Sequence, residues 1–388
     1  MAVIDRIAGW EVELADWRRR LHAIPELDFD LDETAAFVAE RLREIGVDEI
    51  HEGIARTGIV ALIRGRAPGP TIGLRADMDA LPIEEAVDRP WKSQRPGRMH
   101  ACGHDGHTTI LLGAARYLAE TRNFAGTVAL IFQPSEEMSG GGRVMVEEGV
   151  MDRFAITRVF GLHNAPGIAL GRIETRPGPL MAATDQFSVR LKGQGGHAAW
   201  PHACVDPVAA ALALGQAITQ IPAREVDPIK SAVVSLTMIH AGAATNIVPE
   251  TATLGGTVRT LDRDVREAMA ARIAAAVEAI GAAFGVEAQL DYELGYPVTR
   301  NEPEATAFAV RVAAEVVGEG GVDGARRPEL GAEDFAYMLE ARPGAYVFVG
   351  AGEGPGLHHP AYDYNDAVTP IGASYFARLA EAALPLGR

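Results

Sequence analysis

The first half of the chain alternates short apolar segments with segments of helical periodicity. Strands are predicted at 58–65, 71–83, 127–133 and 157–164, and helices at 107–122 and 140–154. The strands are apolar at most positions, which is typical of a sheet covered by helices on both faces. We therefore predict an α/β domain with a central sheet.

The pattern changes after the segment 175–185. It predicts a strand, a helix, two strands, a helix and a strand, at 185–194, 206–221, 231–242, 250–260, 263–285 and 286–296. This β-α-β-β-α-β order is that of a ferredoxin-like α+β domain. From about residue 298 the chain returns to a helix, a buried strand and a final helix. We therefore predict a larger domain built from residues 1–181 and 298–388, into which residues 182–297 are inserted as a small separate domain.

Composition excludes several classes of protein. The net charge of −16 argues against nucleic acid or an anionic membrane surface as the main partner. The chain has no run of 18 apolar residues, so no transmembrane helix is predicted. Residues 1–27 carry acidic residues at helical apolar spacing, which favours an amphipathic helix over a secretory signal. We therefore expect a cytoplasmic protein.

The stretch MHACGHDGHTT, at 99–109, concentrates side chains that bind metals. It holds His100, Cys102, His104, Asp105 and His107, in a chain with 11 His and 2 Cys. Cys, His and carboxylate are the ligand set of Zn²⁺ and similar metals. The second cysteine, Cys204, could pair with Cys102 in a disulfide, but the position of Cys102 in this cluster favours a metal ligand or a nucleophile.

Polar clusters stand at four predicted strand or helix ends. The stretch 99–105 precedes a helix, the pair 136–137 follows the strand 127–133, His163 ends a strand, and 358–359 follow the strand 345–352. In an open α/β sheet, ligands gather at the carboxyl ends of the strands. We therefore expect these clusters to meet in one metal site.

Glu136 and Glu137 suggest a reaction. Adjacent side chains at a strand end point in different directions, so one carboxylate can bind a metal while the other faces a water molecule. That division suits metal-assisted hydrolysis, in which the free carboxylate moves the proton. Taken alone, such a pair is more often the solvated first turn of a helix.

Many ordered motifs together resemble the dinuclear-zinc aminoacylase/carboxypeptidase family, in its bacterial hippurate hydrolase and N-acyl-amino-acid amidohydrolase branch. The resemblance runs nearly from end to end of the chain. The matching segments are RRRLHAIPEL, GLRADMDALPI, MHACGHDGHTT, FQPSEE, FGLHN, GGHAAWPH, TNIVPETATLGGTVRT, GAEDFAYML and LHHPAYDYND.

The resemblance implies a role for each residue of the site. Glu136 would be the general base and acid. One or two divalent ions per subunit would be bound, with Zn²⁺ favoured and Mn²⁺, Co²⁺ or Ni²⁺ as alternatives. The implied metal ligands are Cys102, His104, Glu137, His163 and His358.

Cys102 stands where most of the wider family has a bridging carboxylate. Asp77 stands where relatives have a ligating His, and His104 would supply that imidazole instead. Asp79 would be the carboxylate that orients the site. These departures leave the number of bound ions open.

Three other histidines near these motifs are not expected to bind metal. His358 is preferred over His359 because branch members have His, a variable residue and then Pro. His100 and His107 would form hydrogen bonds around the site, or His107 would cap the following helix.

The inserted domain would act as a dimerisation or lid domain, giving a homodimer or a homotetramer. Its His197 would polarise the scissile carbonyl, and Asn246 and Arg259 would hold the free carboxylate of the substrate. Closure of the two domains would bring His197 and Arg259 to the metal.

The expected function is hydrolysis of the amide bond of small N-acyl amino acids. A dipeptidase or carboxypeptidase with the same metal centre is the first alternative. A non-catalytic metal-binding regulator is a second, although such a protein would not need Glu136. A third is a hydrolase with Cys102 as nucleophile, which would keep its activity after chelation.

Overall fold

The structure is a computed structural model that describes residues 2–387, and the chain forms two compact units. The first unit contains residues 2–180, 300–327 and 334–387. The second contains residues 181–299 and 328–333. The predicted insertion, 182–297, falls within the second unit, which also includes the short segment 328–333.

An eight-stranded sheet is the centre of the first unit, in the order β1-β2-β4-β3-β5-β16-β6-β15. Its four middle strands, β4-β3-β5-β16, are parallel to one another. The strands are β1 (Glu49–Ile54), β2 (Gly58–Arg64), β3 (Ala67–Asp77), β4 (Ala125–Gln133), β5 (Ile156–Pro166), β6 (Ile173–Glu174), β15 (Val322–Asp323) and β16 (Gly344–Gly352). Two short strands, β7 (Gly178–Met181) and β14 (Thr299–Asn301), pair with each other.

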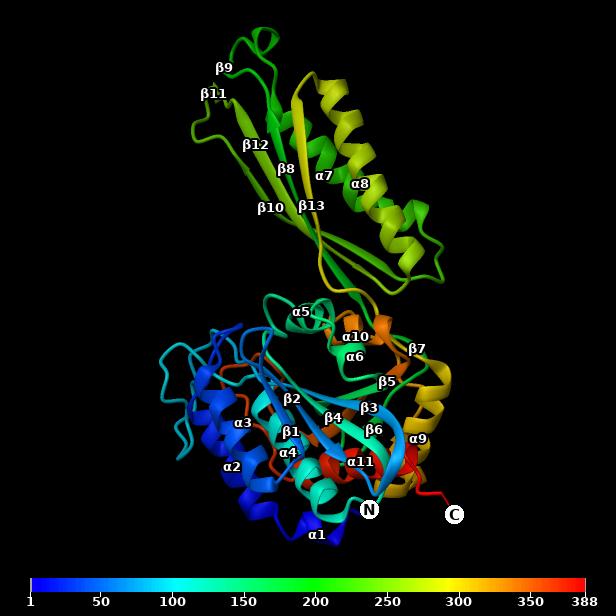
Figure 1. The fold of residues 1–388 in the computed structure, drawn as a ribbon. Coiled ribbons are helices and arrows are strands. Elements are labelled where there is room, and N and C mark those ends of the chain that lie inside the picture. The colour runs from blue at the N-terminus through cyan, green and yellow to red at the C-terminus, as the bar shows by residue number, and fades with distance from the viewer. Residues whose placement is uncertain (1, 388) are drawn as a thin grey trace. The chain divides into compact units, whose positions relative to one another are not determined.

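Helices cover both faces of this sheet (Figure 1). Helices α1 to α4, α9 and α11 form one layer, and α5, α6 and α10 lie on the opposite face. Because both faces are covered, β4, β5 and β16 are buried along most of their length, which explains why their sequences are mainly apolar. The predicted α/β fold is confirmed. The helices are α1 (Asp5–Ala8), α2 (Glu11–Ala23), α3 (Asp32–Ile45), α4 (His104–Thr121), α5 (Gly141–Glu147), α6 (Val150–Arg153), α9 (Pro303–Val317), α10 (Phe335–Ala341) and α11 (Val368–Ala383).

Three predicted elements differ from the observed ones. The strand predicted at 71–83 is β3, which ends at Asp77. The single helix predicted at 140–154 is two short helices, α5 and α6, because Gly149 has a φ of 81° that no continuous helix can contain. The helix predicted to begin at 107 begins at His104. His104 therefore lies on the first turn of α4.

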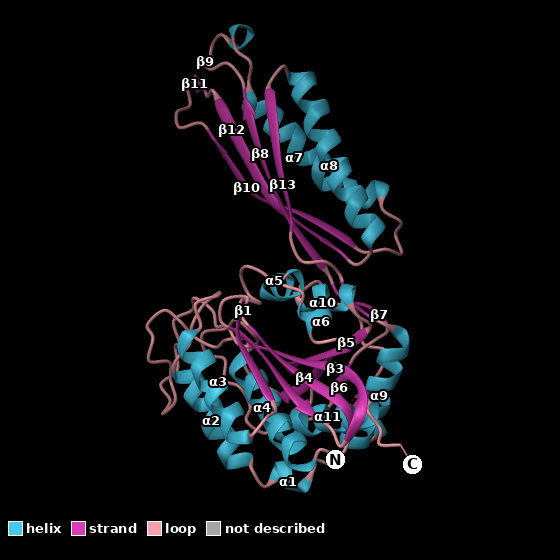
Figure 2. Cartoon of the chain, viewed as in Figure 1, coloured by secondary structure: helices cyan, strands magenta, loops and turns pink. Residues whose placement is uncertain are grey.

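The second unit is a four-stranded antiparallel sheet with two helices on one face (Figure 2). The strand order is β10-β12-β8-β13, so β10 and β13 are the edges. Along β8, buried and less buried residues alternate, as expected for a sheet with one covered face. The elements are β8 (Ala183–Lys192), β9 (Gly196–His197), α7 (Pro207–Glu225), β10 (Ala232–Ala241), β11 (Ile247–Val248), β12 (Thr251–Thr260), α8 (Arg263–Phe284) and β13 (Glu287–Leu294).

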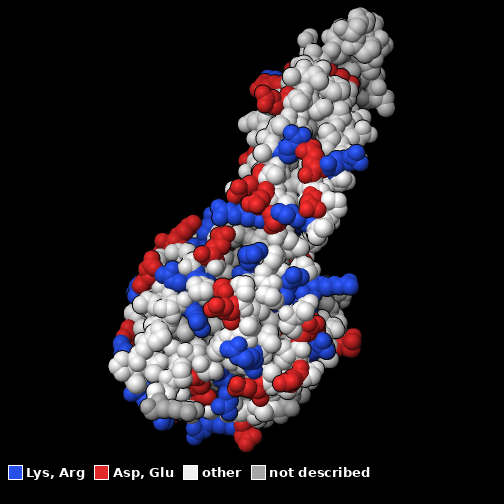
Figure 3. Space-filling model, turned by 90° about the vertical axis from the view of Figure 1, so that its right-hand side faces the viewer, with Lys and Arg blue, Asp and Glu red and all other residues white. Residues whose placement is uncertain are grey.

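The charged surface has no large region of one sign on the face shown in Figure 3, where acidic and basic side chains of the described residues are interspersed. Within residues 2–387, no helix combines the length and the apolar character needed to cross a bilayer. Cys102 and Cys204 are both free thiols.

Candidate metal centre

The four parallel strands in the middle of the large sheet direct the predicted site residues to one edge. Glu136 and Glu137 follow β4, Asp77 ends β3, and His163 lies near the end of β5. His358 is in the loop after β16, where its N–H donates to the carbonyl of Ala101. Since these strands are parallel neighbours, their carboxyl ends place the side chains side by side.

The five predicted ligands lie close together. Cys102 Sγ is 3.4 Å from His163 Nε2, and Glu137 Oε1 is 3.3 Å from His358 Nε2 and 3.7 Å from His104 Nε2. Two overlapping groups have all their donor atoms within 4.8 Å of one another. These groups are Cys102 with His104 and His163, and Cys102 with Glu137 and His358.

The donor atoms of this cluster fit a metal ion. His104 Nε2 and Glu137 Oε1 are buried and make no hydrogen bond, which is costly unless a cation satisfies them. His163 donates from Nδ1 to the carbonyl of Asn164 at 2.6 Å, which leaves its Nε2 lone pair directed at the cluster. Burial lowers the pKa of His163 to about 4, so its ring is neutral, as a metal ligand must be.

Two of the predicted ligands, Cys102 and His104, need a nearby cation to reach the deprotonated form that binds a metal. Burial, with the nearby carboxylates, raises the pKa of the Cys102 thiol well above its usual value. Burial alone would lower the pKa of His104, but Asp77 and Asp79 raise it to about 10. A divalent ion would reverse both effects, because it stabilises the thiolate and displaces the proton from Nε2.

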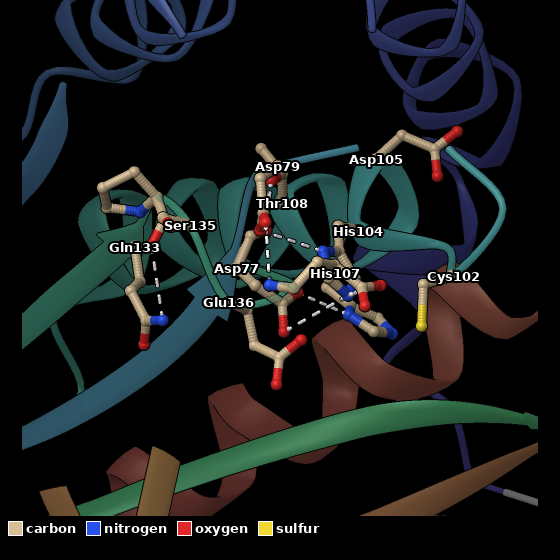
Figure 4. Close-up of polar contacts among 12 residues, drawn as sticks. Asp77, Asp79, Cys102, His104, Asp105, His107, Thr108, Gln133, Ser135 and Glu136 are labelled. Carbon is tan, nitrogen blue, oxygen red and sulfur yellow. Dashed lines mark hydrogen bonds and ion pairs between the residues drawn. The ribbon is translucent and has the colours of Figure 1, made fainter. Parts of the chain in front are cut away.

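Asp79 orients two of the predicted ligands. Its Oδ1 is 3.2 Å from His104 Nδ1, and its Oδ2 accepts a hydrogen bond from the backbone N–H of Glu137 at 2.9 Å. This contact fixes the imidazole so that Nε2 is the atom available to an ion. Figure 4 shows His104 and His107 between Cys102 on one side and Asp77 and Asp79 on the other.

His107 has hydrogen-bond partners at both ring nitrogens, although its donor atom also lies in a close group with those of Asp77 and His104. Its Nδ1 is 2.7 Å from Asp77 Oδ1, and its Nε2 accepts a hydrogen bond from the backbone N–H of Asn164 at 2.9 Å. Both ring nitrogens are therefore engaged. Asp105 points away from the cluster in Figure 4, toward His22 at 2.8 Å. His359 Nδ1 accepts from the N–H of Ala361.

The sequence alone did not single out Asn164 and Tyr362, which support the loop of Cys102. Asn164 Nδ2 donates to the carbonyl of Cys102 at 2.7 Å, and the Tyr362 hydroxyl donates to Asn164 Oδ1 at 2.7 Å. A Cβ atom on Gly103 would lie 2.4 Å from Asn164 Nδ2, so only glycine fits there. The feature of the sequence that could have pointed to them is that both residues lie in motifs of the family resemblance, FGLHN and LHHPAYDYND.

A buried charged layer lies beside Glu136. Arg75 has a fully buried side chain and pairs with Asp77 at 2.7 Å and with Asp334 at 2.9 Å. The N–H of Asp334 donates to Glu136 Oε1 at 3.3 Å. Glu136 itself is buried, and it forms a further group of close donor atoms with His104 and Glu137.

In the second unit, His197 and Asn246 lie next to each other. β9 and β11 pair so that His197 is opposite Ile247, and the N–H of Ala198 donates to the carbonyl of Asn246. The exposed His197 accepts a hydrogen bond at Nδ1 from the N–H of Ala199 at 3.1 Å. The Nδ1 lone pair is therefore used by this contact, and the ring proton that can be donated elsewhere is the one on Nε2.

Arg259 is far from His197 within this unit. In the β8–β12 pairing, Thr251 is opposite Lys192 and Arg259 is opposite Thr184. His197 follows the Lys192 end, so the strand length places Arg259 about 25 Å from it. The expectation that one closure brings both residues to the same metal ion is therefore wrong for one copy of the chain.

The comparisons with known proteins identify the family of the chain. The model of the family described as Peptidase family M20/M25/M40 matches residues 73–382. The chain belongs to this family of metallopeptidase-type amidohydrolases.

Three relatives match over nearly the whole chain. A hippurate hydrolase of Campylobacter jejuni is 40% identical, over 98% of this chain and 99% of its own. An N-acetyl-L-cysteine deacetylase of Bacillus subtilis is 42% identical, over 94% of this chain and 86% of its own. A thermostable carboxypeptidase 2 of Saccharolobus solfataricus is 38% identical, over 98% of both chains.

A solved structure from Bacillus subtilis, described as a dinuclear metal binding peptidase from the M20 family, has the same fold. It matches with a TM-score of 0.85 and 35% identity, over 97% of this chain and 99% of its own. The chain thus belongs to a family with dinuclear metal-binding members and holds groups of side chains able to bind metal.

Proposed function

We propose that the protein hydrolyses the amide bond of N-acyl amino acids and releases a carboxylic acid and a free amino acid. The observation that carries this proposal is the meeting of Cys102, His104, Glu137, His163 and His358 beside the buried carboxylate of Glu136. The hippurate hydrolase and the N-acetyl-L-cysteine deacetylase, which match this chain at 40% and 42% identity, support an N-acylated substrate.

The five ligands would hold one or two divalent ions, with Zn²⁺ favoured by the sulfur and nitrogen donors and Mn²⁺, Co²⁺ or Ni²⁺ as alternatives. A bound ion would make a nearby water more acidic and polarise the scissile carbonyl. Glu136 then takes the proton from the attacking water and passes it to the departing amine. Glu137 remains a ligand, which divides the two adjacent carboxylates between two roles.

His197 would donate a hydrogen bond from Nε2 to the carbonyl oxygen, where negative charge develops. Asn246 and Arg259 would hold the free carboxylate of the substrate. Because His197 and Arg259 lie at opposite ends of the sheet in the second unit, two copies of the chain would supply them to one site. His197 would thus act on the metal centre of its partner.

A homodimer, or a homotetramer built from such dimers, fits this arrangement. β10 is an edge strand of the second unit, and its Met238 and Ile239 are exposed. An open edge with exposed apolar side chains is a surface that pairs readily with another strand. We propose that two copies associate through the second unit, at this edge.

A carboxypeptidase is the second candidate function. The relative from Saccharolobus solfataricus, 38% identical over 98% of this chain, carries that name. The same metal centre and the same proton transfers would cleave a peptide bond next to a free carboxylate. The two functions differ only in the substrate groups that are accepted.

The test is amine release from hippurate, from other N-acyl amino acids and from dipeptides. The enzyme is assayed as purified, after chelation, and after addition of single divalent metals. Loss of activity on chelation and its return with metal support the proposal, whereas activity that survives chelation would favour Cys102 as nucleophile. Cleavage of dipeptides alone would favour the second candidate, and metal binding without any cleavage would favour a regulator.

A further inference from the structure

Trp200 is an exposed indole directly beside His197. Its side chain is 60% exposed, and its ring centroid lies 4.9 Å from that of His197 at an interplanar angle of 36°. The N–H of Trp200 donates to the carbonyl of His197 at 2.8 Å, and Pro201 begins a short 3₁₀ helix directly after it. The two rings are therefore held side by side by a short, constrained turn.

This placement has a consequence for substrate choice, which rests on the proposed function of His197. Because Nδ1 of His197 is bound to the N–H of Ala199, the ring can reach a carbonyl oxygen only through Nε2. When it does so, the indole of Trp200, whose ring centroid is 4.9 Å from that of the imidazole, is the neighbouring aromatic surface on the side of the substrate that faces the second unit. A large exposed aromatic surface at that distance favours a flat apolar group, because it excludes water from both surfaces.

A second observation, in the first unit, points to the same substrate chemistry. Met138 follows the proposed ligand Glu137, and Leu357 precedes the proposed ligand His358. Both apolar side chains are exposed, and the 3.3 Å contact of Glu137 with His358 brings the two segments together. Exposed apolar side chains directly beside a metal centre are expected where an apolar group of the substrate docks.

We propose that Trp200 is a specificity residue that packs against a flat, apolar group of the substrate next to the scissile amide. This group can stand on the acyl side, as the phenyl ring of hippurate does, or on the amino acid side. Acetyl-glycine, which has no such group on either side, would be a poor substrate of the same enzyme.

The test compares kcat/KM of wild type, Trp200→Ala and Trp200→Phe on hippurate, N-acetyl-phenylalanine and N-acetylglycine. Ile229→Ala serves as the control, because Ile229 is an apolar side chain of the same unit that is 93% exposed. We expect Trp200→Ala to reduce kcat/KM about tenfold for at least one aromatic substrate, mainly through KM, with little change for N-acetylglycine. Trp200→Phe should restore most of the loss, and Ile229→Ala should have no effect.

The two aromatic substrates distinguish the position of the apolar group. A loss confined to hippurate places it on the acyl side, and a loss confined to N-acetyl-phenylalanine places it on the amino acid side. An equal loss on all three substrates would overturn the proposal, since Trp200 would then only position His197. No loss on any substrate would also overturn it. So would dissociation of the Trp200→Ala oligomer in size-exclusion chromatography, because Trp200 would then act through assembly. Failure of the wild type to cleave all three would instead refute the proposed function.

Discussion

His104 and Asp79 face each other across 3.2 Å, with Nδ1 of the imidazole toward Oδ1 of the carboxylate. The other carboxylate oxygen holds the backbone of Glu137. One buried side chain thus orients two proposed ligands, one through its ring and one through its backbone. A carboxylate–imidazole pair of this kind makes the imidazole a stronger ligand.

Asp79→Asn should therefore weaken metal binding about 10- to 100-fold, because a neutral amide is a weaker hydrogen-bond acceptor for Nδ1–H than the charged carboxylate. The measurement is a competition titration with a chromogenic chelator. Asp291→Asn, a change of an exposed carboxylate in the second unit, is the control and should bind metal as the wild type does. Unchanged affinity in Asp79→Asn would mean that Asp79 does not support the site.

Glu136 and Glu137 should separate turnover from metal binding. Glu136→Gln should lose about 10²–10⁴ in kcat and keep its metal, because only the proton transfer is removed. Glu137→Gln should lose metal, since its Oε1 is the buried oxygen that faces His104 and His358. Metal content by elemental analysis, beside kcat, distinguishes the two variants. The reverse result would exchange the two roles.

The position of the site could be predicted because it depends on local patterns. Strands buried on both faces are apolar at successive positions, so their ends are visible in the sequence, and polar residues at those ends stand out. β4, β3, β5 and β16 are neighbours in the sheet, which a sequence pattern cannot show, but any parallel arrangement brings their carboxyl ends to the same edge.

The supporting hydrogen bonds could not be predicted, because they join residues that are distant in the chain. Asn164 and Tyr362 are 198 positions apart, and Arg75 and Asp334 are 259 apart. Spacing also could not separate His104 from His107, since residues three apart on a helix lie on the same face. Only the direction of each ring shows which one has a free nitrogen.

The strand register of the second unit led to the proposal that His197 acts at the metal centre of a partner chain. Mixing two inactive variants tests it. A mixture of His197→Ala and Glu136→Gln chains, unfolded and refolded together, should recover about a quarter of wild-type activity, because half of randomly formed dimers are mixed and each has one complete site. The activity of the mixture against each variant alone is the measurement. If His197 served its own chain, no mixed dimer would contain a complete site and the mixture would stay inactive.

His22 should make stability depend on pH. Burial lowers the pKa of its ring, but the hydrogen bond to Asp105 and the 3.5 Å ion pair with Glu85 outweigh this and raise the pKa to about 9, against the opposing charge of Arg18. A folded-state pKa above the unfolded value of 6.5 means that the charged ring stabilises the fold fully below pH 6.5 and loses this contribution as the pH rises through about 9.

His22→Gln should therefore be destabilised by up to about 3 kcal/mol at pH 6, and this difference from wild type should shrink toward pH 9.5. Urea unfolding at both pH values, at a fixed metal concentration, measures it. His202→Gln, at an exposed histidine of the second unit, is the matched control. A deficit in His22→Gln that is constant with pH would mean that His22 acts through packing alone.

Bound metal should stabilise the folded protein in addition to its role in the reaction. Nε2 of His104 and Oε1 of Glu137 are buried and make no hydrogen bond, so the metal-free protein bears a cost that a bound ion removes. Free metal at 100 times its dissociation constant should add about 2.7 kcal/mol to the free energy of unfolding, provided that the unfolded chain does not bind it. Calorimetry of chelated and metal-loaded protein should show a higher Tm for the unfolding of the first unit. Glu137→Gln should respond much less, and an equal response in that variant would place the stabilising ion at another site.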